Sequence, residues 1–247
     1  MSGPAGPADS AGVPWGGRSL PRGDFAGDEG TADVALRRAL DERSVGGSSD
    51  AEVVGALAAA RVLVPVVAVR VEEGGTVHGT SDRQADMALV TLTGPDGRRA
   101  LPVFSSVQTL AAWDAGARPV AVESRRAAAS AVAEGCDVMV LDPAGPTTFV
   151  VARPALWAIG QGRAWCPAHE DPEVLAELHR VVDDEPDVAG VTGGPGSGAQ
   201  LSVVLRVRPG LDAERLHALA QRVAERLGAS PVVAERVEGL ELRVTSA

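Results

Sequence analysis

The stretch GPDGRRALPVFSSVQTLAAW, residues 94–113, contains a turn, a strand and a capped helix in immediate succession. Residues 94–97 predict a tight turn, because proline presets φ and glycine accepts a positive φ. The apolar run Arg99–Phe104 predicts a strand. Pro102 has no backbone N–H to donate to a neighbouring strand, which indicates that this strand lies at a sheet edge. Ser106 is placed to cap a helix that reaches Trp113. This succession predicts an α+β fold.

The flanking segments complete a first domain, which we place at residues 32–153. Upstream, Leu36, Ala39 and Leu40 mark one face of a helix, and a second helix follows Asp50. A strand over 62–71 contains Pro65, which again indicates an edge or a bulge. The remaining elements expected are a strand over 87–93, a strand over 120–122, a helix after Ser124, and strands over 137–141 and 147–151. The order ααβββαβαββ lacks a strict βαβ repeat, so we predict a mixed sheet.

Residues 171–247 predict a smaller second domain, a two-layer α/β sandwich of order αββαββ. Its first helix begins at Asp171 with proline next, and its last two strands, over 232–237 and 240–244, read as a hairpin. Residues 154–170 predict a connector that opens with a short helix. Residues 1–31, rich in Gly, Pro, Ser and Asp, predict a disordered tail.

The composition excludes several classes of enzyme and partner. All 23 basic residues are arginine, and Tyr is absent. Without lysine there is no Schiff base to pyridoxal phosphate, no P-loop and no carrier of biotin or lipoate. The net charge of −10 argues against nucleic acid and anionic lipid as partners. This residue usage resembles that of a GC-rich, actinobacterial genome.

Cysteine usage and apolar runs predict a cytoplasmic protein. The two cysteines, Cys136 and Cys166, imply no disulfide framework. No signal peptide is recognisable, and the longest apolar run, 62–69, is too short to span a bilayer. The four histidines show no metal-ligand spacing, so we expect no metal and no cofactor.

Two motifs bear on chemistry. The glycine-rich segment 193–198 lies between two strands and is followed by no lysine, so a flexible hairpin loop is favoured over a phosphate site. Cys166 precedes His169 by three residues, and a nearby histidine can lower a thiol pKa. A nucleophilic or redox-sensing cysteine is therefore one hypothesis, and an inert cysteine in the connector is the alternative that we favour.

The stretch that opens at Asp96 resembles the DGR–LPVF–S–L–W block of the SseB (enhanced serine sensitivity protein B) family. Residues 57–67 (LAAARVLVPVV), 117–120 (ARPV) and 141–146 (LDPAGP) resemble other blocks of that family, especially of its actinobacterial members. The resemblance covers residues 32–158. Ser105 stands where threonine is common in the family, and Asp142 where asparagine is usual outside the actinobacterial branch. The family name implies a genetic link to serine tolerance and no established catalytic set.

A well-patterned fold without catalytic motifs predicts a protein that is not an enzyme. We expect it to act through an unknown protein partner or a small-molecule ligand, with a binding surface at Asp96, Arg98, Arg118 and Asp142. The first alternative is a small thiol-dependent enzyme or redox sensor that uses Cys166 with His169. The second is an amino-acid-binding regulatory module in the second domain, although its predicted order differs from the βαββαβ order of ACT-type sensors.

Overall fold

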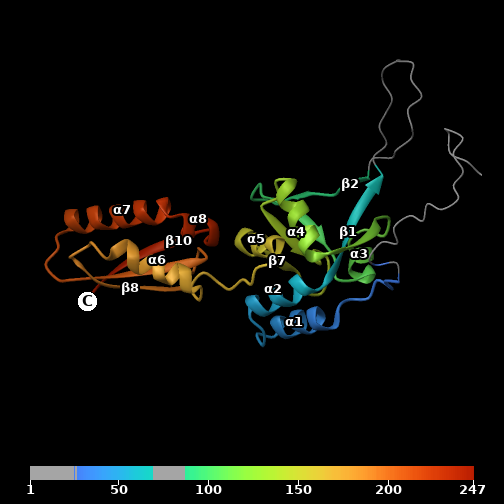
Figure 1. The fold of residues 1–247 in the computed structure, drawn as a ribbon, viewed down its shortest axis with the longest axis horizontal. Coiled ribbons are helices and arrows are strands. Elements are labelled where there is room, and N and C mark those ends of the chain that lie inside the picture. Colours follow the sequence, from blue (N-terminus) through green and yellow to red (C-terminus); the bar gives the residue numbers. More distant parts are fainter. Residues whose placement is uncertain (1–24, 26, 69–86) are drawn as a thin grey trace, which may run out of the picture.

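The computed structural model describes residues 25, 27–68 and 87–247 (Figure 1). The predicted tail lies outside this range up to residue 24, as do residues 69–71 of the strand expected over 62–71. The last residues of the predicted tail contact the first domain: Asp28 forms an ion pair with Arg61, which also donates to the carbonyl of Thr31 at 2.6 Å. None of the described helices is long and apolar enough to cross a membrane.

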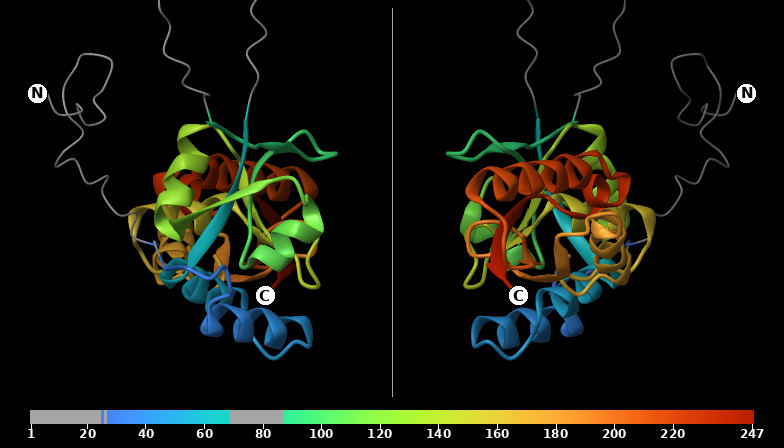
Figure 2. Two further views of the ribbon diagram at one scale, coloured as in Figure 1. Left: turned by 90° about the vertical axis from the view of Figure 1, so that its right-hand side faces the viewer. Right: turned by 90° about the vertical axis from the view of Figure 1, so that its left-hand side faces the viewer.

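The first domain contains two small sheets and the helices packed on them. Two helices come first, and α1 lies at the outer edge of the domain (Figure 2). One sheet has the strand order β2-β1-β5 and the other the order β3-β4-β6-β7. In chain order, the elements of the first domain are α1 (Val34–Ser44), α2 (Asp50–Ala59), β1 (Arg61–Ala68), β2 (Met87–Leu89), β3 (Leu92–Thr93), β4 (Arg99–Val103), α3 (Val107–Trp113), β5 (Arg118–Glu123), α4 (Ser124–Ala133), β6 (Val138–Leu141), β7 (Phe149–Val151) and α5 (Arg153–Gln161).

The second of these sheets contains both parallel and antiparallel pairs of strands and is therefore a mixed sheet. Together with the helices packed on it, this confirms the predicted α+β class. β4 pairs antiparallel with β3 and parallel with β6. The two sheets meet at one bridge, where Leu63 and Phe104 exchange backbone hydrogen bonds of 2.8 Å. Phe104 also lies against Trp113, with ring centroids 5.4 Å apart.

Two prolines lie in strands that are central in their sheets, so the edge position predicted for β4 and the edge or bulge predicted for β1 were wrong. Pro65 pairs with Pro119 of β5, but β2 pairs with β1 only from Val66 onward. Pro102 pairs with β6, whereas β3 ends opposite residues 99 and 100. Each proline thus has a neighbouring strand on one side only. Because proline has no backbone N–H, it fits this position without the loss of a hydrogen bond between strands.

The second domain is built on the sheet β10-β9-β8, with one helical cluster against it (Figure 1). Its elements are α6 (Pro172–Val182), β8 (Val188–Pro195), β9 (Leu201–Val207), α7 (Ala213–Ala229), α8 (Pro231–Arg236) and β10 (Leu240–Ser246). Leu201, Val203 and Leu205 share a buried core with the helices, while Arg206 on the opposite face is exposed.

The hairpin predicted for residues 232–244 is wrong. The apolar run after Ser230 forms helix α8, because the Ser230 hydroxyl accepts from the Val233 N–H and Pro231 occupies the first helical position. The last strand, β10, then pairs parallel with β9. A parallel pair needs a crossover rather than a tight turn, and α7 with α8 supplies it.

The glycine-rich segment lies in a hairpin between two strands, as predicted, but its first residues belong to a strand rather than to the loop. Gly193, Gly194 and Pro195 belong to β8 and pair with β9. A Cβ on Gly193 would stand 3.0 Å from a methyl carbon of Leu175 and 3.1 Å from one of Leu178. This glycine therefore permits close packing of α6 on the sheet, and no phosphate loop is formed.

The two domains have separate hydrophobic cores. The main core of the first domain runs from Leu36 to Ile159, and that of the second from Ala168 to Val237, with no residue in common. Helix α5, which the sequence assigned to the connector, buries Leu156 and Ile159 in the first core. The connection between the cores is therefore the segment from Gly162 onward.

Candidate functional site

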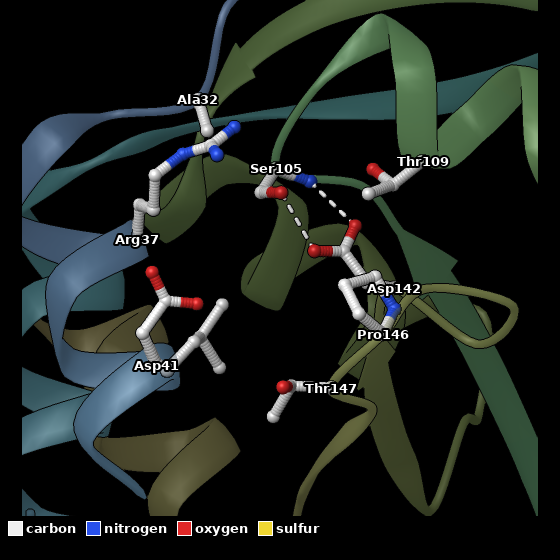
Figure 3. A pocket seen from close by; sticks show the side chains of 9 residues that line it. Ala32, Arg37, Asp41, Ser105, Thr109, Asp142, Pro146 and Thr147 are labelled. Carbon is white, nitrogen blue, oxygen red and sulfur yellow. Dashed lines mark hydrogen bonds between the residues drawn. The ribbon is translucent and has the colours of Figure 1, made fainter. Parts of the chain in front are cut away.

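Two of the sequence's distinctive stretches meet at one point of the first domain. Ser105 follows β4, and Asp142 follows β6 directly. These strands run parallel, so their carboxyl ends lie side by side. The Ser105 N–H donates to Asp142 Oδ1 at 2.8 Å, and its hydroxyl donates to Oδ2 at 2.6 Å (Figure 3). In sheets with parallel strands, this end is where ligands commonly bind.

Asp142 is held in an unusual conformation. It is 3% exposed, and its φ of 50° makes it the one non-glycine residue with positive φ in the part of the chain that the structure describes. Aspartate tolerates this region better than most residues. Its carbonyl accepts from the Gly145 N–H and the Thr148 hydroxyl, both at 2.9 Å. The turn after β6 is thus fixed from within, and backbone strain of this kind often accompanies functional sites.

A cavity of about 60 Å³ opens beside this pair. Helix α1 forms its other wall through Arg37 and Asp41, which are one helical turn apart and both exposed. Figure 3 shows both side chains on the cavity side of α1. Neither side chain makes a hydrogen bond or ion pair with any residue that the structure describes. The wall therefore presents a cation and an anion that both lack a partner among the described residues.

The remaining lining is mostly polar and small. Thr109 and Thr147 contribute hydroxyl groups, and Leu40 and Pro146 contribute apolar surface. A volume near 60 Å³ holds a few water molecules or one small polar group. Within residues 25, 27–68 and 87–247, no cluster of His, Cys, Asp or Glu could hold a metal ion. The arrangement suits binding of a small polar ligand.

The four residues predicted as a binding surface lie in three places. Asp142 lies in the pocket just described. Asp96 and Arg98 occupy the turn between β3 and β4, whereas Arg118 begins β5 in the other sheet. Arg98 Nε donates to Asp96 at 2.6 Å and so lowers the pKa of that carboxyl. The structure thus does not bring the four together.

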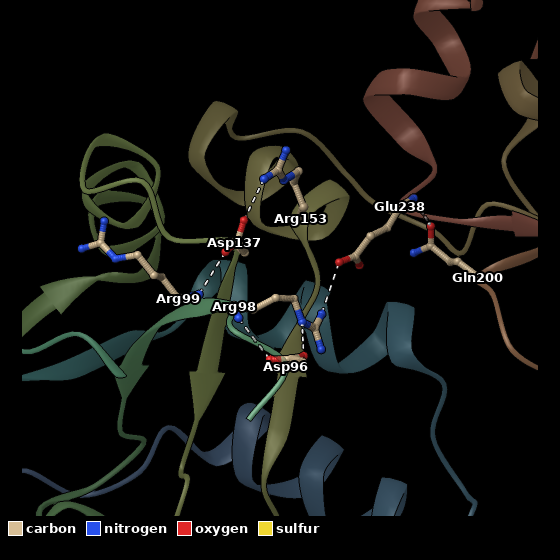
Figure 4. A network of polar contacts seen from close by, with 7 residues as sticks. All are labelled: Asp96, Arg98, Arg99, Asp137, Arg153, Gln200 and Glu238. Carbon is tan, nitrogen blue, oxygen red and sulfur yellow. Dashed lines mark hydrogen bonds and ion pairs between the residues drawn. The ribbon is translucent and has the colours of Figure 1, made fainter. Parts of the chain in front are cut away.

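Arg98 also contacts the second domain. Its Nη1 lies 3.3 Å from Glu238 Oε1, just before β10 (Figure 4). Beside it, Asp137 accepts from the backbone of Arg99 and from the Arg153 guanidinium, both at 2.9 Å. Asp96 and Arg98 therefore take part in a polar contact between the domains.

The environment of Cys166 opposes an activated thiol. Burial, together with the charges of Asp171 and Glu170, raises the pKa of Cys166. No hydrogen bond joins it to His169, whose Nε2 lies 3.4 Å from Glu170 and whose buried Nδ1 has no partner. A raised thiol pKa leaves less thiolate near neutral pH, and the thiolate is the nucleophile.

Sequence reasoning missed Arg37 and Asp41 as pocket residues. They are ordinary charged residues of an amphipathic helix, and only the packing of α1 near the ends of β4 and β6 gives them a role. The available signal was their spacing of four residues beside the buried Leu36 and Leu40, which places both at the border of the buried face.

The geometry defines an α+β protein of two domains with a polar pocket at the carboxyl ends of two parallel strands. Residues 36–158 match the family model of the SseB protein N-terminal domain. The chain therefore belongs to the SseB family. The match begins in α1 and ends in α5, so it contains both walls of the pocket. Comparisons with curated proteins and with solved structures give no match.

Proposed function

We propose that this chain is a non-enzymatic binding module whose first domain holds a small zwitterionic ligand, such as an amino acid, in the pocket between α1 and Asp142. The observation that carries this proposal is the pair Arg37 and Asp41, two charges of opposite sign on one wall, neither of which is paired with another residue in the described part of the chain. A guanidinium binds a carboxylate through charge-assisted hydrogen bonds, and a carboxylate binds an ammonium in the same way. Both ligand charges would then have a partner.

The buried pair Ser105 and Asp142 supports binding rather than catalysis. Both carboxylate oxygens of Asp142 already accept hydrogen bonds from Ser105. No histidine is among the residues that line the pocket to take a proton from the serine hydroxyl. The pair thus fixes the floor of the pocket, and recognition falls to the side chains of α1.

The test is isothermal titration calorimetry of the full chain with the common amino acids. The family's link to serine makes L-serine the first probe. Arg37→Ala should weaken binding about 10- to 100-fold, because a hydrogen bond to a charged group contributes about 1.5–3 kcal/mol. Arg38→Ala is the matched control, since Arg38 lies next along α1 and interacts with Glu42 at 3.7 Å.

Equal affinity of the two variants would contradict the assignment of this pocket. Failure of every amino acid to bind would contradict the ligand class. The thiol alternative has less support, because the pKa of Cys166 is raised and His169 does not contact it by hydrogen bond.

A further inference from the structure

A second cavity, of about 240 Å³, lies where the connector joins the two domains. One wall comes from α5 and the connector, and includes Ala158 and Trp165. The other comes from the start of α6 and from α8 in the second domain, and includes Glu173 and Glu235. Cavities between domains are frequent ligand sites.

The charges around this cleft are unequal. Three carboxylates line it, those of Asp171, Glu173 and Glu235, against the two guanidiniums of Arg163 and Arg236. Arg236 lies 2.8 Å from both Asp171 Oδ2 and Glu173 Oε2, and Arg163 pairs with Glu235 across the cleft. All five charges are engaged in these ion pairs, and the net charge of the lining is one negative.

Two of these carboxylates are accessible to a ligand. The Glu173 side chain is 65% exposed and the Glu235 side chain 42% exposed. The hydrogen bond from Arg163 lowers the pKa of Glu235, which is therefore ionised at neutral pH. Arg163 is itself 45% exposed, so it can move aside without leaving a buried charge.

Trp165 gives the cleft an aromatic wall. It is partly buried and packs against the core of the first domain, which limits the motion of its ring. The face of an indole attracts a cation more strongly than any other aromatic side chain. An aromatic side chain beside accessible carboxylates is a common means of recognising an organic ammonium or guanidinium group.

We infer that the cleft formed by Trp165, Glu173 and Glu235 is a binding site for a small organic cation, an ammonium or guanidinium on a short hydrocarbon body. An anion would meet three carboxylates there, with both arginines already paired. An apolar ligand would cover these charged groups without replacing their contacts with water, which is unfavourable. Since the walls belong to different domains, the bound cation ties the domains together. This site is distinct from the pocket at Asp142.

The probe is agmatine, a guanidinium and an amine on a butyl chain, titrated into the full chain by calorimetry at low ionic strength. Trp165→Leu should weaken binding about 5- to 30-fold, the loss of one cation–π contact in a partly desolvated site. Trp157→Leu is the matched control, because Trp157 lies outside the cleft on α5 and is 42% exposed. The neutral 1,4-butanediol should not bind.

A second variant keeps the test decisive if Trp165→Leu perturbs the fold, as circular dichroism would reveal. Glu235→Gln changes an accessible side chain, removes one negative charge and frees Arg163, so it should weaken agmatine several-fold. Absence of agmatine binding, or Trp165→Leu and Glu235→Gln affinities equal to that of the unaltered chain, would overturn the inference. Neither outcome bears on the proposal for the amino-acid pocket, because that proposal is tested with other residues and another ligand.

Discussion

Substitutions of Asp142 separate the hydrogen bonds of its carboxylate from the cost of its backbone conformation. Asp142→Asn keeps an acceptor for the Ser105 N–H and tolerates the φ of 50°. The amide NH2 then stands where Oδ2 accepted from the Ser105 hydroxyl, so this bond reverses, with the amide donating to the hydroxyl oxygen, and it loses its charge assistance. Hydrogen bonds to charged groups contribute about 1.5–3 kcal/mol and neutral ones about 0.5–1.5 kcal/mol, so we expect a loss of about 1 kcal/mol.

Asp142→Gly and Asp142→Ala remove both acceptors. The Ser105 donors then lie buried without a partner, at about 1–3 kcal/mol for each unmet group. Glycine accepts the positive φ, so for Asp142→Gly we expect only the loss from the two unmet donors, about 2–6 kcal/mol. A Cβ at this positive φ is sterically unfavourable, so the Asp142→Ala variant should be less stable than Asp142→Gly by about a further 1 kcal/mol. The expected order of destabilisation is Ala, then Gly, then Asn.

The assay is urea unfolding followed by tryptophan fluorescence. The described tryptophans, Trp113, Trp157 and Trp165, all precede the second domain, which contains none. Trp113 and Trp157 therefore report the first domain, whereas Trp165 also responds to the cleft that it lines with the second domain. With a slope of about 1.5 kcal/mol per molar urea, a loss of 3 kcal/mol lowers the midpoint by about 2 M.

Asp114→Asn is the control for this series. Asp114 accepts a backbone hydrogen bond from Gly116 at 2.8 Å, but at an exposed position. Its substitution should change stability by less than about 0.5 kcal/mol. Equal midpoints for Asp142→Ala and Asp142→Asn would refute the reasoning, because the acceptor and the tolerance of positive φ that asparagine retains would then make no difference to stability.

Three further changes test other parts of the structure. Gly145→Ala would place a Cβ 2.9 Å from the Cβ of Asp142, so thermal melts should show a loss of about 1–3 kcal/mol. Hydrogen bonding to Arg180 lowers the pKa of Glu177 from 4.5 to about 2, so the folded state binds fewer protons in acid than the unfolded state. Stability should fall as the pH drops from about 4.5 towards 2, and melts of Glu177→Gln should show a smaller decline. Cys166, whose pKa is raised by burial and nearby carboxylates, should react with iodoacetamide at pH 7.5 more slowly than free cysteine, and a faster reaction would revive the thiol hypothesis.

Local signals in the sequence were sufficient for most elements of the fold. The apolar face of α1 is buried as its spacing predicts, and Ser106 caps α3 by accepting from the Thr109 N–H. Such patterns depend on neighbours three or four residues apart, so one chain is enough to recognise them. The α+β class follows from their order.

The failures arose where a local preference competed with a contact distant in sequence. The valines after Ser230 favour a strand, but the serine cap and the proline at the first helical position start a helix. Pro65 indicated an edge because a sequence does not show where the neighbouring strand stops. The pocket was missed for the same reason: Arg37 and Asp142 are far apart in the chain and meet only across α1 and the ends of two strands.

The separation of the two cores bears on how this chain can evolve. A core substitution affects the residues packed around it. In this chain those residues all belong to the same domain as the substituted one. Core substitutions accepted in one half therefore require no compensating change in the core of the other. The family match ends at residue 158, one residue before Ile159 closes the first core. Substitutions in the core of the second domain thus leave the packing around the pocket at Asp142 unchanged.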